Sequence, residues 1–225
     1  RIYRIVPEGA DVRPQWGSDI ALGQASIGAL IQGLERPNEW WRRTAQRLLV
    51  DRNDAAAVEP LRELVRESPS AVGRLHALWT LEGLAALDPA SIRRGLEDDV
   101  AGVRENAIKL AEQHLDEHPD LADVLIGMGD DPDARVQFQL LCTLGALTRP
   151  AARARHERLL FDNIDSPWMQ LAGLTAAELD AVELFQTAVA RLSDDRGESR
   201  AQFFRRVGAL AAVQADRAQI ATLVE

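Results

Sequence analysis

Two helical segments rich in tryptophan and arginine contain the side chains best suited to binding another protein. The first contains Trp40, Trp41 and Arg42, and the second contains His76 and Trp79. The two segments are expected in corresponding helices of successive hairpins, so their side chains can share one face. Tryptophan and arginine dominate the energetics of protein interfaces, which makes these five residues a candidate docking patch. The alternative is a packed contact between neighbouring helices, with the arginines bound to carboxylates.

Other residues with metal-binding or nucleophilic chemistry do not assemble into a site. His114 and His118 are four residues apart, a spacing that lets two imidazoles share a metal ion, but zinc requires at least a third ligand. The pair precedes Pro119 at a polar helix end, which favours a solvated surface, and His156 has a similar surface-like setting. Cys142, the single cysteine, lies in an apolar run and is expected to pack as a small core residue. We therefore expect no metal, no cofactor and no catalytic residues in this chain.

These residues must be positioned by a helical segment that recurs about every thirty residues. Each copy has an arginine near its start and a small or apolar residue three places later. The pairs are Arg42 with Ala45, Arg74 with Ala77, Arg104 with Ala107, and Arg135 with Phe138, which separates the arginines by 32, 30 and 31 residues. Helical hairpins of this length stack because none can bury its apolar face alone. The sequence therefore predicts an all-α fold, an α-solenoid of about five to six hairpins.

Turn residues and prolines divide the chain into these hairpins. The expected helix pairs are 26–34 with 39–51, 56–67 with 71–87, 89–97 with 100–115, 119–128 with 132–147, and 151–161 with 167–177, followed by helices at 179–192, 200–214 and 216–224. Residues 25–225 are thus expected to form one elongated domain. Residues 1–24 differ, because Arg1 to Val6 alternate charged and apolar side chains before a turn. We interpret them as a residual strand and linker from a preceding β domain.

Composition and charge exclude several classes of function. Hydrophobic residues make up 46% of the 225 residues and aromatic residues 5%, a balance typical of packed helices. The formal net charge of −9 opposes binding to phosphate backbones, so we expect no nucleic-acid partner. No stretch approaches the roughly 20 apolar residues that span a bilayer, so we expect no direct membrane insertion.

The recurring arginines have a structural interpretation. Acidic residues precede two of them by a few positions, so an aspartate can cap the following helix and also accept hydrogen bonds from an arginine of the same or a neighbouring repeat. We expect a ladder of such bonds formed by Arg74, Asp99, Arg104, Asp131 and Arg135.

This pattern of Asp, Val, Arg and Ala resembles HEAT-type repeats. Tetratricopeptide arrays and an irregular helical bundle are the alternative folds. Three segments, 1–9, 36–50 and 74–87, also resemble a family of large planctomycete- and verrucomicrobial-type proteins, the membrane-bound dehydrogenase-like proteins. In that family a β-propeller leads into a HEAT-repeat domain and then a cytochrome c domain.

The resemblance implies a noncatalytic scaffold or docking module from a larger redox protein outside the cytoplasm. Its partners would be the β-propeller upstream and the cytochrome c-like domain downstream in the same polypeptide. This chain has no Cys-x-x-Cys-His motif for haem attachment, so neither redox activity is expected within it.

Two other functional classes remain open. One is a free-standing HEAT adaptor that binds another protein. The other is a HEAT-like enzyme, such as an alkylpurine DNA glycosylase or a bilin lyase. The negative charge disfavours the glycosylase, and the sequence contains no set of base, nucleophile and oxyanion donor for either enzyme.

Overall fold

The computed structural model describes residues 21–176, 179–192 and 197–214. Within these ranges the chain forms α-helices and short 3-10 helices without any strand, which confirms the predicted all-α class for the described residues. The α-helices are α1 (Ile27–Gly33), α2 (Glu39–Arg52), α3 (Val58–Glu67), α4 (Ala71–Gly83), α5 (Pro89–Leu96), α6 (Ala101–Gln113), α7 (Leu121–Gly127), α8 (Ala134–Leu144), α9 (Pro150–Asp162), α10 (Pro167–Leu174), α11 (Ala181–Leu192) and α12 (Glu198–Gln214). The 3-10 helices are η1 (Leu22–Gln24), η2 (Ala55–Ala57) and η3 (Met128–Asp130).

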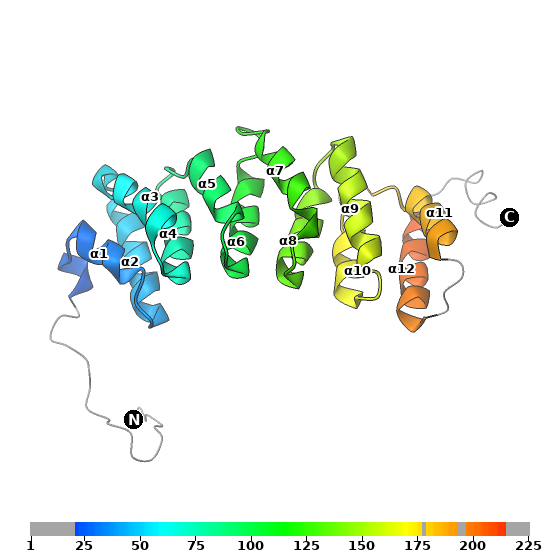
Figure 1. Ribbon diagram of the computed structural model, residues 1–225, viewed down its shortest axis with the longest axis horizontal. Helices are drawn as coiled ribbons and strands as arrows, with labels where there is room; N and C mark the ends of the chain where they lie inside the picture. Colours follow the sequence, from blue (N-terminus) through cyan, green and yellow to red (C-terminus); the bar gives the residue numbers. More distant parts are fainter. Residues whose placement is uncertain (1–20, 177–178, 193–196, 215–225) are drawn as a thin grey trace, which may run out of the picture.

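Consecutive helices pack as six pairs, from α1 with α2 to α11 with α12. The second helix of each pair also packs against the second helix of the next, so that α2, α4, α6, α8, α10 and α12 form a continuous row. First helices α1, α3, α5, α7 and α9 make a parallel row of contacts. Figure 1 shows the pairs following one another along a gently curved molecule, from blue α1 to orange-red α12.

Side-chain caps explain where most helices begin. The Asn38 side chain accepts a hydrogen bond from the backbone N–H of Trp40 at the start of α2, and Ser70 does the same for Gly73 in α4. Capping of this kind satisfies backbone donors that have no partner within the helix. Proline opens α5, α9 and α10, where its missing N–H leaves no helical hydrogen bond unmade.

Alanine and glycine allow the two helices of a pair to approach closely. Ala45, Ala77 and Ala107, the small residues of the recurring segment, are all fully buried. A Cβ atom added at Gly33 would lie 3.0 Å from the Ala45 Cβ, and one at Gly95 would lie 2.9 Å from the Ala107 Cβ. These glycines are therefore needed for the close contact of α1 with α2 and of α5 with α6.

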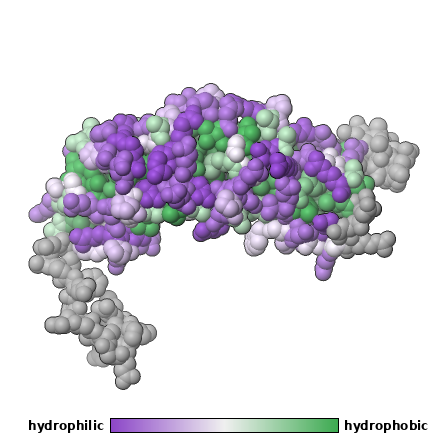
Figure 2. All heavy atoms as spheres, in the orientation of Figure 1, coloured by the Kyte–Doolittle hydropathy of each residue, from purple (hydrophilic) through white to green (hydrophobic). Residues whose placement is uncertain are grey.

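The surface is mostly hydrophilic on the face drawn in Figure 2, with smaller hydrophobic areas between the polar side chains. Among the described helices, none combines the length and the apolar composition needed to cross a membrane. The expected strand at 1–6 and the expected helix at 216–224 lie outside the described residues.

Candidate functional site

The predicted docking patch contains one strongly exposed aromatic residue, Trp40 in the first turn of α2. Its side chain is 53% exposed, and its ring meets the edge of Trp41 with ring centroids 5.2 Å apart. Trp41 is half-buried, with the guanidinium of Arg36 lying 4.7 Å from its ring centroid. Trp40 borders a surface depression formed by one face of α2, which we call the α2 surface; it consists of Glu39, Trp40, Arg43, Thr44 and Arg47.

Arg42 points away from this surface and stabilises the turn that precedes α2. Its Nη1 atom donates hydrogen bonds of 2.6 and 2.7 Å to the backbone carbonyls of Arg36 and Pro37. The Nε atom of Arg42 is buried and has no hydrogen-bond partner among the described residues. Arg42 is therefore a structural residue of the turn.

His76 and Trp79 join neighbouring helices. The Nδ1 atom of His76 lies 2.7 Å from Oε1 of Gln46, which links α4 to α2. Burial, followed by the positive charge of Arg42, lowers the pKa of His76. The indole N–H of Trp79 donates to Asn106 at 3.0 Å, which links α4 to α6. The structure thus favours packing between helices for these two residues, the alternative interpretation of the predicted patch.

The structure contains a ladder of arginine–aspartate hydrogen bonds, but the carboxylate that Arg74 binds is Asp98 and not the predicted Asp99. Arg74 donates two hydrogen bonds to the Asp98 carboxylate, from Nε at 2.6 Å and from Nη2 at 2.7 Å. Its Nη1 atom donates to the Ser68 carbonyl at 2.7 Å. Asp98 is only 2% exposed, whereas Asp99 is exposed. The prediction for Asp99 was wrong because the side chain of Asp98 turns inward, where it also accepts from the backbone N–H of Val100.

Arg104 and Asp131 repeat this geometry one pair further along. The Nε and Nη2 atoms of Arg104 donate to Asp131 at 2.7 and 3.0 Å, and Nη1 donates to the backbone carbonyl of Asp98 at 2.7 Å. Asp98 therefore binds Arg74 through its carboxylate and Arg104 through its carbonyl. Because Asp98 accepts from Arg74 of α4 and from Arg104 of α6, it connects successive helix pairs.

The predicted role of Arg135 was wrong. Its side chain is 69% exposed and pairs with Asp133, two residues away in its own turn. The ladder position is taken by Gln137, whose amide donates to the Asp131 carbonyl at 2.6 Å. Leu140, three residues beyond Gln137, is buried, while Phe138 is exposed.

Each ladder residue donates to the carbonyl six positions before it. We call this set the turn ladder; its members are Arg42, Arg74, Arg104, Gln137 and Gln170. Gln170 also donates to the Ser199 carbonyl at 2.8 Å, which ties α10 to the start of α12. Arg74, Arg104 and Gln170 also bond a residue near the start of the next helix of the row, whereas among the described hydrogen bonds Arg42 and Gln137 bond only their own turn.

Charge pairing sets the pKa values in the ladder. Burial on its own would raise the pKa of Asp98, but hydrogen bonds from Arg74 and the Val100 N–H outweigh it and lower that pKa. The carboxylate hydrogen bonds in turn raise the pKa values of Arg74 and Arg104. The Arg74–Asp98 pair is therefore ionised at neutral pH.

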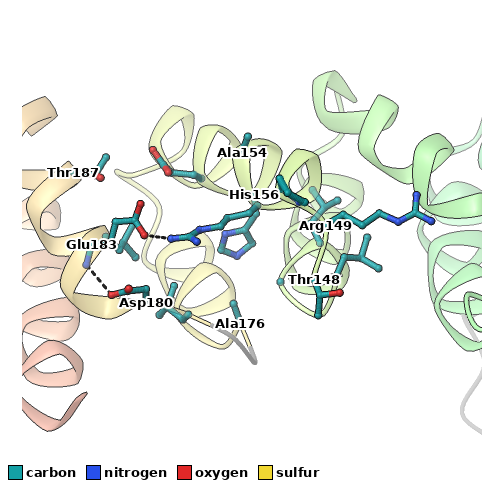
Figure 3. Close-up of a pocket in the computed structure, with 16 residues that line it drawn as sticks. Thr148, Arg149, Ala154, His156, Ala176, Asp180, Glu183 and Thr187 are labelled. Carbon is teal, nitrogen blue, oxygen red and sulfur yellow. Dashed lines mark hydrogen bonds and ion pairs between the residues drawn. The ribbon is translucent and has the colours of Figure 1, made fainter. Parts of the chain in front are cut away.

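A cavity of about 430 Å³ lies near the C-terminal end of the row, bordered by the end of α8, by α9 and by α11. Figure 3 shows the imidazole of His156 extending from α9 into the space above Ala176, with Asp180 and Glu183 on the opposite side. His156 is only 6% exposed. The prediction of a surface-like His156 was wrong, since α9 turns this side chain inward although charged residues flank it in the sequence.

Burial lowers the pKa of His156 to about 4, against a smaller opposing effect from a hydrogen bond to the Gly173 backbone. The Nε2 atom of His156 is buried without a hydrogen-bond partner among the described residues. The ring is therefore neutral at physiological pH. No sequence motif marked this residue, and only the helical periodicity of α9 carried a signal of its burial.

The remaining candidate side chains, His114, His118 and Cys142, contact neighbouring residues and do not form a metal or catalytic site in the described part of the chain. Nε2 of His114 lies 2.7 Å from Glu82, and the rings of His114 and His118 stack with centroids 6.5 Å apart. Within the described part of the chain, no three histidine, cysteine, aspartate or glutamate side chains are grouped as metal ligands. Cys142 is half-buried, and burial raises the pKa of its thiol.

Comparison with protein-family models gives no match for this chain, and neither does comparison with curated protein sequences. Functional assignment therefore depends on the residues and contacts described above.

Proposed function

We propose that this chain is a HEAT-like α-solenoid that acts as a noncatalytic scaffold and docking module. Support for the repeat assignment comes from the six helix pairs in one row and from the turn ladder, which places one polar side chain at the same point of five successive turns. A repeated turn contact of this kind is expected where each unit depends on its neighbours for stability.

The parent protein that we propose is a redox protein of the membrane-bound dehydrogenase-like type, located outside the cytoplasm. The support is the resemblance of segments 1–9, 36–50 and 74–87 to that family. In such a protein this chain would connect an upstream β-propeller to a downstream cytochrome c-like domain. Support for a structural role of the recurring arginines comes from Arg74 and Arg104, because each guanidinium bonds a carboxylate of one turn and a backbone carbonyl of another.

The exposure of Trp40 beside two mostly exposed arginines, Arg43 and Arg47, is the observation that carries the docking proposal. An indole that is more than half exposed leaves apolar area in water, and covering that area stabilises a complex. Arg43 and Arg47 flank it with side chains that are mostly exposed, and within the described residues they pair only with acids of the same helix, Glu39 at 3.5 Å and Asp51 at 4.0 Å. A partner surface with an apolar side chain for Trp40 and carboxylates for the arginines fits this arrangement.

Side-chain footprinting of this chain and of the full natural polypeptide tests the proposal. We expect Trp40 to be protected in the full polypeptide, and Trp40→Ala combined with Arg43→Glu to release the neighbouring domain. Trp168, which is 71% exposed on α10, provides the matched control, because Trp168→Ala removes an exposed indole outside the α2 surface. Equal labelling of Trp40 in both samples would refute docking through this surface.

The same experiment separates the free-standing adaptor from the internal module. If the natural polypeptide contains no further domain and Trp40 is protected only on addition of a second protein, the surface belongs to an adaptor.

A further inference from the structure

Three exposed apolar side chains lie on two neighbouring second helices, α8 and α10. Phe138 of α8 is 37% exposed, and Trp168 and Leu171 of α10 are 71% and 43% exposed. Trp168 and Leu171 are three residues apart, so they lie on the same face of α10. Phe138 and Leu171 each follow a member of the turn ladder, Gln137 and Gln170, and so hold the same position in their helices. We call Phe138, Trp168 and Leu171 the α8–α10 surface.

Packing of the second helices brings these side chains to one face of the row. α10 contacts α8 on one side and α12 on the other, and Figure 1 shows the three helices side by side. Helices in contact lie about 8 to 10 Å apart, so α8 and α10 present two apolar rows at about that separation. Covering such rows removes apolar area from water and stabilises a complex.

Two arginines of α12 border the α8–α10 surface. Nη1 of Arg206 donates to the Pro167 carbonyl at 3.3 Å and to Oε1 of Gln170 at 2.8 Å, which places its guanidinium beside the first turn of α10. Arg205, the preceding residue, is exposed. Within the described part of the chain neither arginine forms an ion pair with a carboxylate. Their positive charge is therefore uncompensated.

The local charge is opposite in sign to that of the whole chain. The chain has a formal net charge of −9, whereas α10 contains no charged residue and is bordered by Arg205 and Arg206. On the α8 side, Arg135 is already paired with Asp133. Carboxylates around an apolar side chain would complement this arrangement. The net negative charge opposes a nucleic-acid phosphate backbone, which favours the carboxylates of a protein.

We propose that the α8–α10 surface binds an acidic amphipathic helix of another protein. A helix with its side chains is about 10 to 12 Å across, so it can cover both apolar rows, whereas an extended segment, with the strand spacing of about 4.8 Å, covers one. Its apolar side chains would contact Phe138, Trp168 and Leu171, and its carboxylates would face Arg205 and Arg206. The proposal is independent of docking through the α2 surface, because the two surfaces share no residue and α4 and α6 lie between them.

Two synthetic amphipathic peptides test the proposal. Both have leucine at every third and fourth position, and the remaining positions are glutamate in one peptide and lysine in the other. Fluorescence anisotropy of the labelled peptides measures affinity. We expect the glutamate peptide to bind with a dissociation constant of about 100 µM or below, and the lysine peptide to bind at least about tenfold more weakly. Added salt should weaken binding of the glutamate peptide.

Proton–nitrogen correlation NMR locates the contact, because the chain has five tryptophans and each indole N–H gives one resonance. The Trp168 resonance, identified by its loss in Trp168→Ala, should shift on addition of the glutamate peptide. Trp168→Ala should weaken binding at least about tenfold, and Leu171→Ser serves as a second variant. Trp40→Ala is the matched control, since it removes an exposed indole of another surface and should leave the affinity unchanged.

Circular dichroism establishes that each variant is folded. Equal affinities for the two peptides, or an unchanged affinity in both Trp168→Ala and Leu171→Ser, would overturn the proposal. Absence of binding at about 1 mM glutamate peptide would also overturn it. Sedimentation supplies the last test, because self-association that Trp168→Ala abolishes would show that a second copy of the chain covers the surface instead.

Discussion

Replacing Arg74 by alanine should produce a large loss of stability, because it leaves Asp98 buried without its main partner. The substitution removes three hydrogen bonds of 2.6 to 2.7 Å, two to the Asp98 carboxylate and one to the Ser68 carbonyl. Leaving one member of a buried ion pair unpaired costs about 3 to 5 kcal/mol. Asp98 retains the Val100 N–H, and Arg94 lies 3.7 Å away, so we expect a value near the lower end, about 3 kcal/mol.

Urea unfolding followed by circular dichroism measures this loss, and pH supplies a second test of its cause. Without Arg74, burial raises the pKa of Asp98 above its value in the unfolded chain, so the folded variant gains stability relative to the native protein as the pH falls. The difference in the free energy of unfolding between the native protein and the Arg74→Ala variant should therefore become smaller between pH 7 and pH 5. Adding Asp98→Asn to the variant should recover about 1 to 2 kcal/mol at pH 7, because the amide carries no charge.

Arg135→Ala is the matched control, since this arginine begins a helix at nearly the same point but is exposed and pairs only with Asp133. We expect no measurable change in its free energy of unfolding. Equal losses in the Arg74 and Arg135 variants, or a pH-independent deficit in the Arg74 variant, would refute the reasoning.

Three further predictions concern the C-terminal half of the row. His156 has a pKa of about 4 in the folded chain, so between about pH 6.5 and 4 the unfolded chain binds a proton that the folded chain does not, and the free energy of unfolding decreases as the pH falls. In urea unfolding, His156→Leu should remove about 2 to 3 kcal/mol of this decrease between pH 7 and 4.5. Gln170→Ala should destabilise the chain by about 2 kcal/mol, because the Ile164 and Ser199 carbonyls lose their donor, and amide hydrogen exchange should accelerate in α12 before α4. Cys142 should react with iodoacetamide at least about tenfold more slowly in the folded than in the unfolded chain, since burial raises its pKa and limits access; equal rates measured by mass spectrometry would contradict this.

Helices and their pairing were predictable because local rules determine them. The expected segment 39–51 corresponds to α2 (Glu39–Arg52), and 71–87 contains α4 (Ala71–Gly83), whose start is fixed by the Ser70 cap. Prolines fixed the starts of α5 and α10 at the expected residues, Pro89 and Pro167, although α10 ends three residues earlier than expected. Capping and apolar periodicity depend on residues only a few positions apart, so they can be predicted from a single sequence.

The ladder register was only partly predictable because the repeated feature is a hydrogen bond and not a residue type. Glutamine can donate to a turn carbonyl as arginine does, so Gln137 is the fourth member of the turn ladder. Arg135 matches the spacing of the other arginines in the sequence but pairs with Asp133 instead. Both positions are followed three residues later by an apolar residue, and only the structure shows that Leu140 is buried and Phe138 exposed.

Side-chain direction limited the prediction of sites. Trp40, His76 and Trp79 share helical positions that the sequence places near one another, yet only Trp40 points into solvent. His156 is flanked by Arg155 and Glu157 in the sequence, but helix packing buries the histidine and leaves a cavity beside it. Such contacts depend on which helices meet, which is set by the whole row.

The lack of an onward bond from Gln137, in contrast to Arg74 and Arg104, has a mechanical consequence. Asp98 and Asp131 fasten successive turns with charged bonds, which stiffens the row from α4 to α8. Between Gln137 and Ile164 the described residues make no corresponding bond, and the charged bonds that cross this joint are more exposed pairs, Arg149 with Asp123 at 2.9 Å and Arg155 with Asp130 at 3.4 Å. Bending applied at the two ends should therefore be taken up more at this joint than between α4 and α8. The cavity that His156 borders lies next to this joint, between the end of α8 and α11, so bending at the joint would change the width of the cavity.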